Sequence, residues 1–347
     1  MRYLLIFGLV LAVLVGPAEA DERQASVKAD AWTEYKSKFL DPSGRILDDA
    51  NGNVSHSEGQ GYGLLLSFLA NEPADFEQIW SFTRRELLLR DDGLAAWKWS
   101  PDDDPHVTDI NNATDGDILI AYSLALAAER WSRNDYSQAA VSIAKAILDK
   151  TVVDHGGRTL LLPGVAGFAA ADRADGPVIN PSYWVFEALP VFDRLVPSPK
   201  WQALAADGKA MIQAMKFGPE DMPADWVSAK TTLKPASGFP REFGFNALRI
   251  PLYLMRAEQA DRGFLLRLQR GMSGPHGELL TRDLETGAVR ATLTDPGYRF
   301  INHILACVLE GTKVPENAKA FRPTQYYPST LHLLGLTFVE EKHPECL

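Results

Sequence analysis

The 347-residue sequence predicts an all-α protein whose single domain follows a short N-terminal signal. No stretch alternates apolar and polar residues for long enough to build a sheet domain. Segments with apolar residues at helical spacing instead alternate with loops of uneven length. No linker rich in proline, serine or charge divides residues 21–347, so we expect one domain there.

The N-terminal segment has the pattern of a secretory signal peptide. Arg2 provides a charged start, residues 4–15 are apolar, and residues 18–20 read Ala-Glu-Ala, a small-x-small cleavage signal. The alternative is a membrane anchor, but the apolar run is shorter than the roughly 20 residues that span a bilayer. We therefore expect a signal at residues 1–20, a mature chain from Asp21, no membrane span after cleavage, and a secreted or periplasmic location.

Composition and charge narrow the class of partner. The chain has 46% hydrophobic and 23% charged residues, as ordinary globular proteins do. Its formal net charge of -10 and sequence pI of about 5.3 argue against nucleic acid or an anionic membrane, because those partners need basic patches. A neutral or cationic ligand fits better.

The two cysteines, Cys307 and Cys346, leave two alternatives open. They could pair in the oxidising environment that an exported chain meets, or they could stay as two free thiols. Neither has the CxxC spacing of a redox or zinc site, and the sequence has no His-x-x-x-His pair or EF-hand spacing. We expect neither a metal nor a cofactor.

Apolar periodicity and capping residues place the helices along the chain. We expect helices at residues 25–40, 58–70, 73–90, 115–128, 134–148, 201–215, 261–270, 297–309 and 327–336. The segment 115–128 is apolar on nearly every face, which is typical of a buried inner helix, whereas the segment 134–148 is amphipathic.

Residues 56–70 combine a polar first half with an apolar second half. Ser57 and Gln60 have the spacing of a capping box, so the helix should begin at Glu58, with its carboxyl group in the first turn. The three glycines of this segment each cost about 1 kcal/mol of helix propensity relative to alanine. A bulky ligand lying on the backbone is one reason for their presence.

Other helix starts also carry polar or aromatic residues. Thr114 is a natural N-cap, which puts Asp115 at the first helical position and Asp117 at the third. Asn180 likewise should cap a helix start that carries Tyr183, with Pro181 at the favoured first helical position.

Arg249 lies near a further helix start, and two tryptophans lie in an extended segment. Trp97 and Trp99 are two residues apart, so their rings should face one side of that segment, with Lys98 on the other. The alternative is that both rings are buried.

If the helices form a ring with like ends together, these residues line a single mouth. Carboxylates beside tryptophan and tyrosine suit a sugar-binding cleft, because glycosidic cleavage uses two carboxyl groups and sugar rings stack on aromatic faces. The helix dipole favours the anion of Glu58, whereas a general acid must carry a proton. Burial or a neighbour such as Asp115 must then outweigh the dipole. The alternative is that both acids only cap their helices.

Four motifs resemble, in order, those of glycoside hydrolase family 8. They read Ser-Glu-Gly-Gln-Gly-Tyr-Gly at 57–63, Ala-Thr-Asp-Gly-Asp at 113–117, Asn-Pro-Ser-Tyr at 180–183 and Asn-Ala-Leu-Arg-Ile-Pro at 246–251. The resemblance covers about residues 45–330 and is strongest to the endoglucanases of bacterial cellulose-synthesis systems. It implies an (α/α)6 barrel and an inverting attack on β-1,4-glucan, and it suggests the cellulose synthase machinery as a partner.

The resemblance also implies roles for individual residues. Glu58 matches the family's proton donor. Asp115 matches an aspartate that has been assigned both to catalysis and to holding the distorted sugar. Trp97 and Tyr183 match aromatic residues of the sugar subsites, and Arg249 matches an arginine beside the catalytic aspartate.

Asn246 departs from the family pattern, because many members have at this position an aspartate that acts as general base on water. An amide cannot accept a proton at neutral pH in the way that a carboxylate can. We therefore expect Asn246 to bind substrate or water. Asp115 is the first choice for the base, and Glu242, one helical turn before Asn246, is the second.

Three functions are compatible with these residues. The first is a secreted endo-β-1,4-glucanase. The second, suggested by Asn246, is a β-glucan-binding protein that has kept the cleft but lost the chemistry. The third, suggested by the acidic composition, is a chitosanase of the same family.

The signal peptide gives a testable prediction. Because the cleavage signal ends at Ala20, mass spectrometry of the exported protein should show Asp21 as its first residue. An intact Met1 end would contradict it.

Overall fold

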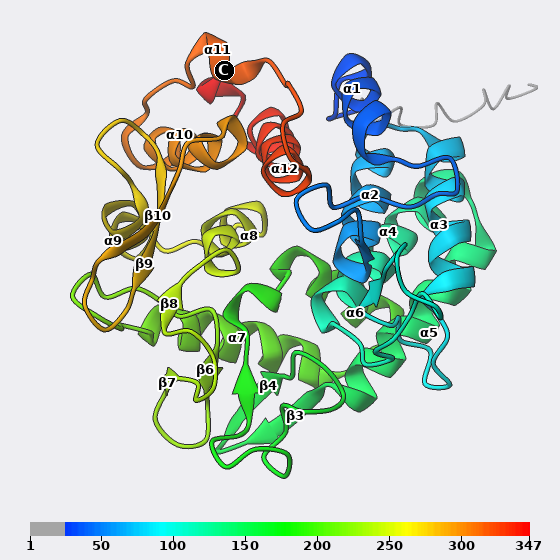
Figure 1. Cartoon of the computed structure of the whole chain (residues 1–347), viewed down its shortest axis with the longest axis horizontal. Coiled ribbons are helices and arrows are strands. Elements are labelled where there is room, and N and C mark those ends of the chain that lie inside the picture. The colour runs from blue at the N-terminus through cyan, green and yellow to red at the C-terminus, as the bar shows by residue number, and fades with distance from the viewer. Residues whose placement is uncertain (1–24) are drawn as a thin grey trace, which may run out of the picture.

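The computed structural model describes residues 25–347, so the predicted signal peptide lies outside the described residues. Two layers of helices form a closed ring (Figure 1), and short antiparallel sheets occupy the connections between them. Among the described residues, no helix is both long and apolar enough to cross a membrane.

The inner layer contains the most apolar helices. Nearly every residue of the second and eighth helices, and most residues of the fourth and twelfth, are buried, so these helices turn little polar surface toward water. The inner helices are α2 (Ser57–Leu69), α4 (Thr114–Trp131), α6 (Leu189–Leu195), α8 (Ile250–Arg256), α10 (Pro296–Glu310) and α12 (Tyr326–Lys342).

The outer helices pack on this ring with one face. In α5, for example, the buried residues Tyr136, Ala140, Ile143 and Ile147 recur at helical spacing. The outer helices are α1 (Ala29–Phe39), α3 (Pro73–Glu86), α5 (Asn134–Lys150), α7 (Pro199–Ala214), α9 (Arg262–Met272) and the short α11 (Glu316–Lys319).

The inner ring closes through direct contacts between neighbours. Helix α2 packs against α4 and α12, α4 against α6, and α8 against α10 and α12. The 3-10 turn η2 (Phe186–Ala188) joins α6 to α8. The last inner helix therefore meets the first, and the chain forms one complete circuit (Figure 1).

The sheets have two or three strands each and are all antiparallel, as expected from the lack of a long alternating pattern. Three of them connect loops around the starts of inner helices. They pair β1 (Ser55–His56) with β2 (Lys98–Trp99), β5 (Val178–Ile179) with β6 (Val227–Ser228) and β7 (Lys234–Pro235), and β8 (Glu242–Phe243) with β9 (Leu279–Asp283) and β10 (Val289–Leu293). The fourth is the pair β3 (Val152–His155) and β4 (Arg158–Leu161).

The predicted helices are all present, with boundaries that shift by up to six residues, the largest shift being at the end of α12. The start of α8 next to Arg249 was predicted, but its extent was not, and the short α6 and α11 were not predicted, because each of these helices is too brief to show clear periodicity. The β9–β10 hairpin was also missed.

The predicted capping box at the start of α2 is wrong. Helix α2 begins at Ser57, and its N-cap is His56, whose Nδ1 accepts a hydrogen bond from the Gly59 amide at 3.0 Å. The buried Gln60 side chain instead accepts from the Ile46 amide at 2.6 Å and donates to Thr83 Oγ1 at 3.0 Å. Tertiary partners have replaced the local motif, since a buried amide must satisfy both its donor and its acceptor.

The predicted cap of the α4 helix is also wrong by one residue. Thr114 is the first helical residue and Ala113 the cap, so Asp115 stands second in the helix. The Thr114 hydroxyl donates to the Leu162 carbonyl at 2.7 Å and ties α4 to the loop after β4. By contrast, Asn180 caps the turn η1 (Pro181–Tyr183), as predicted.

The glycines of α2 pack against protein and do not mark a ligand on the backbone, which corrects that expectation. A Cβ atom on Gly61 would lie 2.5 Å from Leu119 Cβ of α4, and one on Gly63 would lie 2.5 Å from Ile46 Cγ1. On α4, a Cβ atom on Gly116 would lie 2.7 Å from the backbone nitrogen of Glu58. These glycines let the starts of α2 and α4 approach closely.

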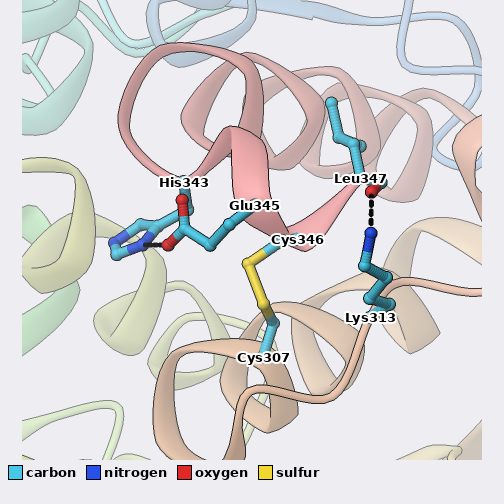
Figure 2. Close-up of a disulfide and its surroundings, with 6 residues drawn as sticks. All are labelled: Cys307, Lys313, His343, Glu345, Cys346 and Leu347. Carbon is cyan, nitrogen blue, oxygen red and sulfur yellow. Dashed lines mark hydrogen bonds and ion pairs between the residues drawn. A yellow bond between two sulfur atoms is a disulfide. The ribbon is translucent and has the colours of Figure 1, made fainter.

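Cys307 and Cys346 form a disulfide, which decides between the two alternatives (Figure 2). The bond ties the chain end, in the 3-10 turn η4 (Pro344–Cys346), to α10. His343 and Glu345 lie beside it, but Cys346 has no free thiolate to complete a metal site with them.

The contact between α2 and α4 predicts the effect of Gly116→Ala. The added methyl group would clash with backbone atoms of Ser57 and Glu58 that cannot rotate away, so the free energy of unfolding in urea should fall by about 1–3 kcal/mol. The matched control is Gly263→Ala on the exposed side of α9, where the better helix propensity should give up to about 1 kcal/mol of added stability. Unchanged stability of Gly116→Ala would show that the two helices do not depend on this close approach.

Candidate active site

Three sequence-predicted residues meet at the starts of three inner helices. The guanidinium of Arg249, which ends the turn η3 (Ala247–Arg249) just before α8, donates to Glu58 Oε1 through Nη1. Through Nη2 it donates to Asp115 Oδ2 at 2.7 Å. The expectation that like helix ends form one mouth is therefore confirmed for α2, α4 and α8.

These three side chains differ in exposure. Those of Asp115 and Arg249 are each 2% exposed, whereas that of Glu58 is 21% exposed. Asp115 also accepts a hydrogen bond from the Gly116 amide at 2.9 Å, so both of its oxygens have partners. Burial raises the pKa of Asp115, while its two hydrogen bonds favour the anion. Asp115 is thus placed to hold Arg249, and Glu58 is the member that reaches solvent.

Asp117 stands apart from this cluster. It accepts hydrogen bonds from the Ala95 amide and from Asn112 Nδ2, each at 2.8 Å. Burial raises the pKa of Asp117 to about 7. Its contacts support the loops on either side of the α4 start and do not reach the Arg249 cluster.

Tyrosines surround Arg249. The guanidinium carbon lies 5.8 Å from the ring centre of Tyr183 and 6.0 Å from that of Tyr253, whose hydroxyl bonds that of Tyr62. Burial raises the pKa of Tyr62, Tyr183 and Tyr253, so these hydroxyls stay neutral at ordinary pH. They surround the charged cluster with neutral hydrogen-bonding groups and apolar rings.

A cavity of about 430 Å³ opens beside Glu58. Its size is within the range of ligand-binding clefts, and tyrosines form much of its wall. The residues that line it include Glu58, Asn246, Arg249, Phe245, Tyr298, Tyr326 and Tyr327. Phe245 is 50% exposed, so an aromatic ring stands free at the rim.

His56 was missed by sequence reasoning and holds the start of α2. Its Nδ1 accepts from Gly59, so Nε2 must carry the proton that bonds Asp48 Oδ2 at 3.3 Å. Burial alone would raise the pKa of Asp48, but hydrogen bonds from His56, Asn51 and Ala50 stabilise its carboxylate and lower that pKa. The Asp48–His56 pair therefore fixes the turn that carries Glu58.

Trp97 and Trp99 do not form one aromatic surface, which corrects that expectation. The guanidinium carbon of Arg45 lies 4.4 Å from the centre of the Trp99 ring, and the centres of the Trp99 and His106 rings are 4.2 Å apart. Trp97 is half-buried, donates to Asp109 Oδ2 at 2.8 Å, and has Lys98 Nζ 5.1 Å from its ring centre. Its carbonyl accepts from the Ser57 amide at 2.9 Å, which places Trp97 beside the start of α2 although it does not line the 430 Å³ cavity.

A second aromatic group lies next to Tyr183. The Trp226 ring is stacked with Phe168 at 5.6 Å and with Phe239 at 4.4 Å between centroids. Tyr183 meets Trp226 edge-on at 6.2 Å. These residues come from three loops, where no periodic pattern marks them in the sequence.

Asn246 lies in the cavity wall next to an aspartate that sequence reasoning missed. Asn246 Nδ2 donates to Asp225 Oδ2 at 3.2 Å. Asp225 is 4% exposed, and burial raises its pKa to about 6. Glu242, the weaker choice for a base, lies 3.5 Å from Arg290 and does not line the cavity.

Arg249 holds both Glu58 and Asp115, and Glu58 reaches the tyrosine-lined cavity, where its carboxyl group can protonate the oxygen between two sugars. This arrangement is that of a glycoside hydrolase. Its sequence matches the family model described as glycosyl hydrolases family 8 over residues 14–270, and the chain belongs to that family.

Two relatives illustrate the similarity. An endoglucanase of Cellulomonas uda is 40% identical over 226 residues, which are 65% of this chain and 62% of that protein. The match thus spans less than two thirds of that relative. A probable endoglucanase of Novacetimonas hansenii is 36% identical over 275 residues, 78% of this chain and 80% of that protein.

Solved structures agree with the fold. An endo-β-1,4-glucanase of Acetobacter xylinum has a TM-score of 0.81 and 34% identity, and the alignment covers 91% of this chain and 98% of that one. A family 8 endoglucanase of Klebsiella pneumoniae has a TM-score of 0.80 and 33% identity, with 90% and 99% covered. The fold is therefore the (α/α)6 barrel that the motifs implied.

The two ends of α8 provide a test of the Arg249 cluster. Arg249→Lys keeps one positive charge but cannot hold two carboxylates in a planar fork, so kcat on a soluble glucan should fall about 100-fold through misplacement of Glu58. Arg256→Lys, at the far end of α8, loosens the buried pair with Glu187 and should lower the melting temperature while leaving kcat near normal. Equal effects of the two variants on kcat would show that Arg249 acts only through stability.

Proposed function

We propose that the protein is an endo-β-1,4-glucanase that hydrolyses cellulose or a related β-glucan with inversion. The observation that carries this proposal is Glu58, partly exposed in the tyrosine-lined cavity and held by Arg249 beside Asp115. Relatives named as endoglucanases support the substrate class.

Glu58 is the proposed proton donor. One guanidinium faces two carboxyl groups, so the cluster has a net negative charge while both are ionised. A proton on Glu58 neutralises the cluster, and substrate that displaces water from the cavity strengthens that preference. Glu58 then gives its proton to the glycosidic oxygen as the bond to the anomeric carbon breaks.

Two neighbours orient this donor. Asp115 holds Arg249 from the side away from solvent, and Arg249 fixes one oxygen of Glu58, so the other can turn toward the substrate. Tyr183 and Tyr327 supply neutral hydroxyls and rings near the sugar. Trp97, beside the start of α2, is proposed to stack on a sugar ring.

We also propose that the protein is exported and acts in the periplasm or outside the cell. The disulfide between Cys307 and Cys346 supports this, because such bonds persist in oxidising compartments. A role beside the cellulose synthase machinery is proposed on the motif resemblance alone.

Replacement of the proton donor tests the proposed activity. Glu58→Gln keeps the shape but cannot donate a proton in the same way, so reducing-end release from carboxymethylcellulose should fall about 100- to 10,000-fold. The control is Glu77→Gln, which should retain full activity, because Glu77 is a partly exposed acid on α3 that pairs with Arg133.

The stereochemistry of the reaction gives a separate test. Inverting hydrolysis of a β-linkage first yields the α-anomer, so NMR of the initial product should show that anomer.

Other outcomes would identify the alternatives. If wild type and Glu58→Gln release reducing ends at the same rate, the enzyme proposal fails and the β-glucan-binding protein becomes the better explanation. Faster cleavage of chitosan than of carboxymethylcellulose or lichenan would point to a chitosanase.

A further inference from the structure

An inverting hydrolase needs a group that removes a proton from the attacking water, and the carboxylates near Glu58 are already engaged. Asp115 has Arg249 on one oxygen and the Gly116 amide on the other. Asp48, which lines the cavity, accepts from Ala50, Asn51 and His56. Every oxygen of these two carboxylates already accepts at least one hydrogen bond from the protein.

Asn246 offers a free acceptor in the same cavity as Glu58. The hydrogen bond with Asp225 fixes the orientation of this amide. The Asp225 carboxylate can only accept hydrogen bonds, so the amide group that faces it must be the donor, Nδ2. The Oδ1 atom then points away from Asp225, and no described residue donates a hydrogen bond to it.

Asp225 is held rigidly behind that amide. Its Oδ1 accepts from the backbone amides of Gly244 at 2.8 Å and Ala247 at 3.0 Å. Its Oδ2 accepts from Asn246 twice, from the backbone at 3.3 Å and from the side chain at 3.2 Å. The whole turn before α8 is thus organised around one buried carboxylate.

We propose that Asn246 and Asp225 together remove the proton from the attacking water, with Asn246 as a relay between water and Asp225. This inference rests on the proposed glucanase activity. As the water oxygen bonds to the anomeric carbon, one water proton moves to Asn246 Oδ1. The Nδ2 proton moves at the same time to Asp225 Oδ2, and Asn246 becomes the imidic acid.

The atoms balance over one turnover. Glu58 gives one proton to the leaving oxygen, and the relay takes one proton from water. Asp225 then returns its proton to Nδ2 while Oδ1 releases its proton to solvent, from which Glu58 is protonated again. The net reaction adds one water molecule across the glycosidic bond and needs no other reactant.

The pH dependence follows from the state of Asp225. The relay requires the anion, and burial raises the pKa of Asp225 to about 6, so activity should fall as the pH falls through this value. The ionisable groups around it are Glu242, which lies near Arg290, and Tyr183 and Tyr327. Burial raises the pKa of both tyrosines, so they remain neutral across this range.

The test is an exchange of the two side chains. Asp225→Asn should lower kcat on carboxymethylcellulose about 100- to 10,000-fold and abolish the acid limb of the pH profile. The double variant Asp225→Asn/Asn246→Asp puts a carboxylate directly on the water, with an amide behind it, and should recover kcat to within about 10-fold of wild type. If Asp225 only stabilises the turn, the double variant will stay as impaired as the single one.

Two further variants cover misfolding and the rival base. Asn246→Ala leaves the three backbone donors of Asp225 in place, and it should lose activity to the same extent as Asp225→Asn while keeping its melting temperature. Asp115→Asn should lower the rate but keep the acid limb. The proposal is overturned if Asn246→Ala keeps full activity, or if the acid limb disappears in Asp115→Asn and stays in Asp225→Asn. An inactive wild type would instead refute the proposed function itself.

Discussion

Arg249 and Asp115 are charged groups withdrawn from water, and such groups are stable only when they face each other. Their pairing requires the starts of α4 and α8 to meet at one point, and the Glu58 bond adds the start of α2. If the starts of these inner helices did not meet, Arg249 or Asp115 would be buried without a partner, which would destabilise the folded state considerably. The same ion pairs that hold Glu58 thus constrain the architecture.

The close approach of α2 and α4 depends on small residues and on buried polar contacts. Gly61 and Gly116 remove the side chains that would separate the two backbones. The Gln60 side chain links α2 to the Ile46 segment and to α3 through hydrogen bonds with the Ile46 amide and the Thr83 hydroxyl. His56 caps the first turn of α2. Apart from the local His56 cap, these contacts join residues that are distant in sequence, so the rigidity of the site depends on the packing of the whole domain.

Sequence reasoning succeeded where a pattern repeats and failed where partners are distant. Periodicity predicted the long helices and the inner position of α4, and motifs brought Glu58, Asp115 and Arg249 together. Local capping rules failed at Ser57 and Thr114, because Gln60 and Thr114 found better partners across the fold. Asp225 lies in an irregular segment without period, and its contact with Asn246 is visible only in three dimensions.

The disulfide affects how the ring can come apart. The ring closes where its last inner helix, α12, contacts the first outer and inner helices, α1 and α2, and we call this contact the seam. Only noncovalent contacts cross this seam, such as Tyr35 with Thr330 at 2.9 Å. The Cys307–Cys346 bond anchors the tail of α12 to α10 and so prevents the chain from unzipping at that end. Tyr326 and Tyr327, which line the cavity, are the first residues of the same helix, so the disulfide and the cavity wall lie at opposite ends of α12.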